Sequence, residues 1–145
     1  MCCDGSLFSF VAVSAAEART LRASGVEVRE QAGALKLPQR CGALLGKCCT
    51  VYEQRPFVCR RFDCLLARAV SEKELPIDEA LGIVGEAHAR LGRLDGLLPR
   101  RKPSEPSGAV LRAATIAQSG TPVGDATRRA FDEAQDYLRR HFVPD

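Results

Sequence analysis

Five of the seven cysteines of this 145-residue chain lie between residues 41 and 64, in the stretch CGALLGKCCTVYEQRPFVCRRFDC. The other two, Cys2 and Cys3, are adjacent at the start of the chain, and no cysteine follows Cys64. A tetrahedral zinc site or a cubane iron–sulfur cluster takes four thiolates, usually from separate segments, and this half of the chain supplies enough thiols. The C-x-x-C pairs that make a zinc site recognisable from spacing are missing. Spacing alone therefore leaves open a metal, disulfides, a reactive thiol and a cysteine-rich core.

The compartment narrows these alternatives. No apolar run approaches the ~20 residues that span a bilayer, and the N-terminal apolar patch lacks the basic region of a secretory signal. We therefore expect a cytoplasmic protein with no membrane partner. In a reducing cytosol stable disulfides are rare, and an odd number of cysteines cannot form a complete disulfide framework.

Charge and composition disfavour several function classes. The net charge is only +3, the basic residues are mixed with acids, and there is no Trp. The Phe and Tyr residues are not interleaved with Lys and Arg as base-stacking platforms would be, so we expect no nucleic-acid partner. No Ser-His-Asp spacing, phosphate loop or paired-carboxylate motif is visible. The catalytic residues, if any, are thus unknown, and whether the protein is an enzyme stays open.

The residue pattern predicts a mainly α fold with a small irregular β part, in which a helical C-terminal half closes a loop-rich cysteine-cluster half. We expect a single domain, 1–145, with halves 1–66 and 67–145 and a Pro-rich connection at 97–108. Ser14 and Glu17 have the spacing of a capping box. The expected strands are 7–13, 26–30 and 34–38, and the expected helices are 15–24, 57–70, 77–95, 108–118 and a last helix opening at Thr121-Pro122.

The helix predicted from Pro56 constrains the cysteines on it. Cys59 and Cys64 are five residues apart, which is roughly 140° around an ideal helix of ~3.6 residues per turn. If both bind one metal, the helix has to start after Cys59 or distort between the two. Thiolate-held metals need cations or N–H donors nearby, and Arg55 and Arg60 are placed in sequence to supply positive charge.

The stretch CTVYEQRPFVCRRFDC (residues 49–64) resembles the C-x-[IV]-Y-x-x-R-P-x-x-C-R-x-F-x-C signature of the bacterial YkgJ-like cysteine-cluster family. LPQRC (37–41) is similar to the segment before that signature, and CCDG (2–5) to the end of the family's N-terminal C-x-x-C-x-x-C-C motif. The family is described as zinc- or iron-chelating, or as iron–sulfur proteins, and includes relatives of flagellin lysine methylases. The resemblance covers residues 1–66 and says nothing of 97–145.

By position, the resemblance implies a set of metal ligands, with Cys48 outside the pattern as an extra thiol. These ligands are Cys2, Cys3, Cys41, Cys49, Cys59 and Cys64. Around them, the residues expected in a second shell are Tyr52, Arg55, Arg60 and Asp63. The upstream cysteines of the N-terminal motif are absent, so either the start lies further upstream or this member binds with fewer ligands.

The resulting hypothesis is a cysteine-cluster protein that holds an iron–sulfur centre or zinc, in a redox or protein-modification role. Thiolate-only ligation suits both metals. The alternative is a non-enzymatic module with a purely structural zinc whose helices bind a protein partner. A third hypothesis is a metal-free thiol redox sensor that uses Cys48 and Cys49.

Overall fold

The predicted capping box begins the first helix, α1 (Ala15–Ala23). In the computed structural model, which describes residues 1–143, Ser14 Oγ accepts a hydrogen bond from the Glu17 amide at 3.2 Å. Glu17 Oε2 accepts one from the Ser14 amide at 2.7 Å. The helix ends just before Gly25, whose φ of 76° lies in the left-handed region that glycine adopts freely. Both ends of this helix are therefore confirmed as the sequence predicted them.

Three short antiparallel strands follow the predicted positions and form a sheet in the order β1-β3-β2. They are β1 (Phe10–Ala12), β2 (Arg29–Gln31) and β3 (Ala34–Pro38). Val11 pairs with Leu37 across the first interface. Ala32 and Gly33, both with positive φ, make the two-residue turn between β2 and β3, which suits the twist of a tight hairpin. A second, two-stranded sheet joins β4 (Leu44–Leu45) to β5 (Cys48–Cys49).

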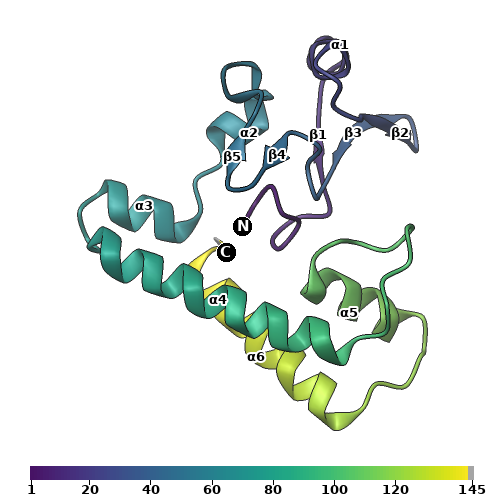
Figure 1. Ribbon diagram of the computed structural model, residues 1–145, viewed down its shortest axis with the longest axis vertical. Helices are drawn as coiled ribbons and strands as arrows, with labels where there is room; N and C mark the ends of the chain where they lie inside the picture. The colour runs from purple at the N-terminus through teal and green to yellow at the C-terminus, as the bar shows by residue number, and fades with distance from the viewer. Residues whose placement is uncertain (144–145) are drawn as a thin grey trace. The chain divides into compact units, whose positions relative to one another are not determined.

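The chain divides into two compact units, residues 1–62 with 106–108 and residues 63–105 with 109–143. The core of the first unit lies where α1 and the sheet meet the segment after β3 (Figure 1). Its buried members are Ala18, Leu21, Val26, Val28, Leu37, Cys41, Ala43 and Val51. One predicted metal ligand, Cys41, is thus part of the hydrophobic core.

The segment Pro106–Gly108 packs in the first unit against the N-terminal turn at Gly5. Gly5 has a φ of 86°, and a methyl group at Gly108 would overlap the Gly5 carbonyl oxygen. The end of the Pro-rich connection is therefore fitted to the segment that carries Cys2 and Cys3.

The single helix predicted for 57–70 is wrong. The structure has a 3-10 turn, η1 (Tyr52–Gln54), then α2 (Phe57–Arg61), and a separate α3 (Leu65–Ser71). Phe62 is extended, and its ring makes an edge-to-face contact with Phe8 at a centroid distance of 4.9 Å. Cys64 then starts α3 as its N-cap, because its Sγ accepts from the Ala67 amide at 3.4 Å.

The second unit is helical. Its longer helices are α4 (Ile77–Leu97), α5 (Ala109–Gln118) and α6 (Asp125–His141). Figure 1 shows α4 and α6 running side by side. Both helices carry small buried side chains, such as Ala87 on α4 and Ala134 on α6. The buried Arg112 of α5 pairs with Asp95 of α4 at 2.9 Å.

Two details of the helical prediction need correction. The last helix does not open at Thr121-Pro122, because Gly124 is extended, with a ψ of 157°, and serves as the N-cap. Leu81, which the spacing of apolar residues at threes and fours in 77–95 places on the apolar stripe of α4, is 61% exposed.

The fold class is confirmed as mainly α with a small β part. The compact units divide after Phe62, so residues 63–66 belong to the second unit. Among residues 1–143, no helix is long and apolar enough to cross a membrane.

Candidate metal centre

The vicinal cysteines at the N-terminus are held through their backbone. The buried side-chain amide nitrogen of Gln39 is in position to donate to the carbonyl oxygens of Cys2 and Cys3, at 3.1 and 3.2 Å. The Cys41 amide donates to the Cys3 carbonyl oxygen at 2.8 Å. Gln39 and Cys41, in the segment after β3, therefore both hydrogen-bond to the backbone of the N-terminal turn. The sequence offered no signal for this role of Gln39.

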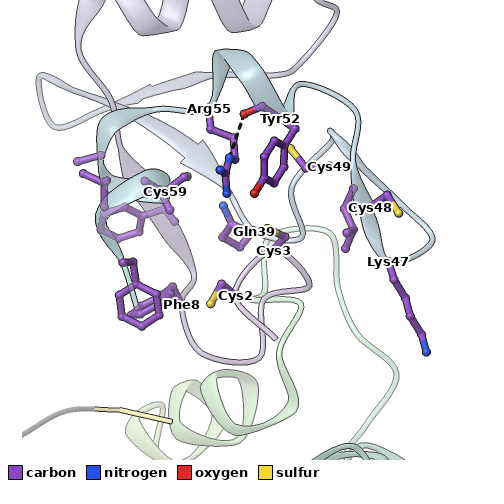
Figure 2. Close-up of a pocket in the computed structure, with 16 residues that line it drawn as sticks. Cys2, Cys3, Phe8, Gln39, Lys47, Cys48, Cys49, Tyr52, Arg55 and Cys59 are labelled. Carbon is purple, nitrogen blue, oxygen red and sulfur yellow. Dashed lines mark hydrogen bonds between the residues drawn. The ribbon is translucent and has the colours of Figure 1, made fainter. Parts of the chain in front are cut away.

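The β4–β5 hairpin separates the roles of Cys48 and Cys49. Successive side chains of a strand point to opposite faces, and here Cys48 is exposed while Cys49 packs against the core of the first unit. Figure 2 shows the Cys48 sulfur at the outer edge, directed away from the other labelled cysteines. Thr50 closes the hairpin, since its amide and Oγ1 both donate to the Ala43 carbonyl oxygen. The Cys48 and Cys49 side chains therefore lie in different environments, one exposed and one packed against the core.

Cys59 stands on α2, whose first turn is capped from a distant part of the chain. Glu17 Oε1 accepts from the Phe57 amide at 2.6 Å, while its other oxygen completes the capping box of α1. The capping box was predictable from local spacing, but this second contact, 40 residues away in sequence, was not.

Four thiols influence one another electrostatically: Cys3, Cys41, Cys49 and Cys59. Burial and the neighbouring Cys3, Cys41 and Cys49 raise the pKa of Cys59 to about 11, although Arg55 opposes the shift. Burial, then Cys41 and Cys49, raise the pKa of Cys3. Burial also raises the pKa of Cys41, against a hydrogen bond from Ala43. Mutual influence of this kind requires that the four groups lie near one another.

The four thiols reach this region from separate parts of the chain, namely the N-terminal turn, the segment after β3, strand β5 and helix α2. None of Cys3, Cys41, Cys48, Cys49, Cys59 and Cys64 forms a disulfide. In residues 1–143, no group of three or more His, Cys, Asp or Glu side chains is arranged to hold a metal ion. The donor set thus has the soft, four-thiol chemistry that zinc and iron–sulfur clusters take, while the sulfur atoms are not at ligand positions.

Cys2 and Cys64, the other two ligands that the resemblance implies, belong to different units. Cys2 lines the same pocket as Cys3 (Figure 2), so the N-terminal pair presents both residues to it. Cys64 belongs to the second unit, where its sulfur caps α3.

The residues expected in a second shell have different environments. The Arg55 guanidinium lies 3.6 Å over the Tyr52 ring, and Arg55 Nε donates to the Tyr52 carbonyl oxygen at 3.0 Å. Both residues line the pocket with the cysteines. Arg60 is exposed and acts electrostatically on Glu17, and Asp63 is an exposed residue of the second unit.

The pocket has a volume of about 680 Å³ and lies within the first unit. Cys2, Cys3, Cys49 and Cys59 contribute to its lining, with Cys48 at the edge (Figure 2). Most of its remaining lining is aromatic or aliphatic, and it includes no Asp or Glu. The thiols therefore open onto an apolar cavity and not onto bulk solvent alone.

Comparisons with known protein families, with curated proteins and with solved structures found no match to this chain.

Proposed function

We propose that this protein binds an iron–sulfur centre or a zinc ion through the thiolates of Cys3, Cys41, Cys49 and Cys59. The observation that carries the proposal is that these thiols come together from four separate segments. Cys3, Cys49 and Cys59 line one pocket, and Cys3 and Cys49 pack against the core cluster that contains Cys41. Without a metal, their proximity and burial oppose ionisation. A bound cation reverses this, since coordination deprotonates a thiol and relieves the repulsion between thiolates.

Ligation requires the four side chains to converge. The backbone that carries them is held by Gln39, by the Cys41 amide and by the capped N-terminus of α2. Side-chain rotation about χ1 is therefore the movement we expect on metal binding. Arg55, which partly offsets the rise in the pKa of Cys59, supplies positive charge beside the thiolates.

Cys2 and Cys64 are candidate further ligands because of the family resemblance. In the cytoplasm, the cysteines that hold such a centre would not be oxidised to disulfides. When bound, an iron–sulfur cluster would supply one-electron chemistry, whereas zinc would supply structural cross-linking or Lewis acidity. The protein is thus proposed as a metal-binding protein, with a redox or protein-modification role dependent on the metal.

Anaerobic purification followed by metal and acid-labile sulfide analysis tests the proposal. Stoichiometric iron and sulfide with visible charge-transfer absorption would identify a cluster, and colourless protein with one zinc per chain would identify a zinc site. Protein that takes up neither iron, with sulfide supplied, nor zinc would refute the proposal. Such protein would favour the metal-free thiol sensor.

Serine variants identify the ligands. Cys59→Ser and Cys49→Ser are expected to lose most of the bound metal, because a neutral hydroxyl is a poor substitute for a thiolate. Cys48→Ser is the matched control, adjacent to Cys49 but exposed, and should retain the metal. Equal loss in Cys48→Ser and Cys49→Ser would contradict the ligand set, and loss in Cys64→Ser would add Cys64 to it.

A further inference from the structure

The cavity beside the thiols is far larger than a metal site needs. Its volume of about 680 Å³ falls within the ~300–1,000 Å³ of pockets that enclose small organic ligands. Structural zinc sites are closed by their four protein ligands, whereas reactive sites keep an open side. Space next to the cysteines is therefore the first sign that something other than a metal enters here.

The walls that face the cysteines are apolar. Phe8 and Phe62 form an edge-to-face pair at 4.9 Å, and both line the cavity together with Phe10 and Val58. Phe10 is 44% exposed and Val58 47% exposed, so neither side chain is fully covered, although Lys36 Nζ lies 4.0 Å over the Phe10 ring. An apolar ligand body would remove this surface from water.

The charged groups of the lining are both cationic. Among residues 1–143, Lys47 and Arg55 are the only ionisable side chains of the lining besides the cysteines and Tyr52. Figure 2 shows Lys47 pointing outward while Arg55 extends inward beside the Tyr52 ring. Arg55 Nε is occupied by the Tyr52 carbonyl oxygen. Its terminal nitrogens have no hydrogen-bond partner in residues 1–143. A guanidinium that lies over an aromatic ring at 3.6 Å and has its terminal nitrogens unoccupied in residues 1–143 is suited to bidentate binding of a carboxylate or sulfonate.

We propose that the cavity binds a small organic anion with an aromatic or branched apolar body, whose acidic group pairs with Arg55 and whose body lies among Phe8, Phe10, Val58 and Phe62. The proposal extends the proposed function, because it places this ligand beside the metal-binding thiols. The cavity itself is present without any metal.

Two fluorescent probes that differ by one charge test the charge preference. The probe 8-anilinonaphthalene-1-sulfonate carries a sulfonate on the same ring system as the neutral N-phenyl-1-naphthylamine. In titrations of the full chain as purified, we expect the anionic probe to bind about tenfold more tightly, equivalent to ~1.4 kcal/mol. Equal affinity for the two probes would overturn the proposal.

Variants locate the binding. Arg55→Met should remove the preference for the anion and leave binding of the neutral probe unchanged, while Arg61→Met is the matched control. Arg61 stacks over Phe57 at 5.5 Å and does not line the cavity, so its variant should keep the preference. Retention of the preference in Arg55→Met would refute the assignment of Arg55.

Val58→Trp adds bulk inside the cavity at a partly exposed position and should weaken both probes. Unchanged binding of both probes in this variant would show that they bind elsewhere and would also overturn the proposal. Because the anionic probe also binds partly unfolded chains, each variant's far-UV circular dichroism is compared with that of the wild type. Metal content is measured on the same samples. Protein that binds metal but shows no preference for the anionic probe would support the proposed function and overturn this inference. Protein that prefers the anionic probe but binds no metal would support this inference and overturn the proposed function.

Discussion

One carboxylate, that of Glu17, caps two helices, and its replacement should disturb Cys59 more than it disturbs the fold. Glu17 Oε2 accepts from the Ser14 amide at 2.7 Å and Oε1 from the Phe57 amide at 2.6 Å. The N-cap of α2 is Pro56, which makes no side-chain capping bond. Glu17 is therefore the side chain that satisfies the first amide of the helix that carries Cys59.

The size of the effect follows from the two contacts. Loss of a capping side chain costs about 0.5–2 kcal/mol, and because Glu17 is partly exposed, solvent screening places each contact toward the low end. We expect Glu17→Ala to lower the free energy of unfolding by about 1–2 kcal/mol in total. Glu17→Gln keeps one carbonyl acceptor and should lose about half as much.

Ser14→Ala is the matched control. It removes the 3.2 Å bond from the Glu17 amide to Ser14 Oγ and leaves both carboxylate contacts in place. Urea unfolding followed by far-UV circular dichroism measures stability, and mass spectrometry after thiol alkylation measures the access to Cys59. Glu17→Ala should speed alkylation of Cys59 in metal-free protein, and Ser14→Ala should not. If both variants change Cys59 equally, Glu17 acts only through α1 and the reasoning fails.

The contribution of Glu17 also depends on pH. The hydrogen bond from the Phe57 amide, followed by those from Ser14, lowers the pKa of Glu17. The stabilisation is thus complete above the unfolded-state pKa of about 4.3 and is lost as the pH falls through the lower folded value. The difference in the free energy of unfolding between wild type and Glu17→Gln should therefore shrink as the pH falls below the unfolded-state pKa. A difference that is constant with pH would contradict the role of the carboxylate.

Two further predictions concern the cysteines and a glycine. In reduced, metal-free protein, iodoacetamide should label Cys48 faster than Cys59, because Cys48 is exposed while burial and neighbouring thiolates raise the pKa of Cys59 to about 11; equal labelling rates by mass spectrometry would contradict this. Gly108→Ala should lower the free energy of unfolding by about 1–3 kcal/mol, since its methyl group would overlap the Gly5 carbonyl oxygen. Gly92→Ala, in open space on α4, should instead stabilise by about 0.5–1 kcal/mol, and urea unfolding compares the two.

Predictability from sequence followed the range of the interactions. The capping box at Ser14 was predicted, and the helix end beside Gly25 and the turn at Ala32 and Gly33 agree with the expected ranges. Each of these features involves residues within a few positions of one another. The predicted start of α6 was wrong, although a helix start also depends on neighbouring residues. The Thr-Pro pair resembles a helix start as closely as the extended Gly124 does.

The candidate site depended more on distant contacts. The contact of Glu17 with α2 joins residues 40 positions apart, and the bonds of the Gln39 amide join residues more than 30 positions apart. Neither contact has a signature in a single sequence. The pairing of Phe62 with Phe8 was hidden for the same reason. Residue spacing could identify the cysteines as a set, but not the neighbours that hold them.

The break between α2 and α3 alters the argument about Cys59 and Cys64. On one continuous helix the two thiols would point roughly 140° apart at ~3.6 residues per turn, which opposes joint ligation. In the structure Cys59 belongs to α2 and Cys64 precedes α3, with the extended Phe62 between the helices. The angle of an ideal helix therefore does not apply to this pair of cysteines. Cys64 Sγ is engaged by the Ala67 amide at 3.4 Å, and because thiolates of metal centres accept such N–H donors, this bond is compatible with ligation. Retention of metal in Cys64→Ser would restrict the role of Cys64 to capping α3.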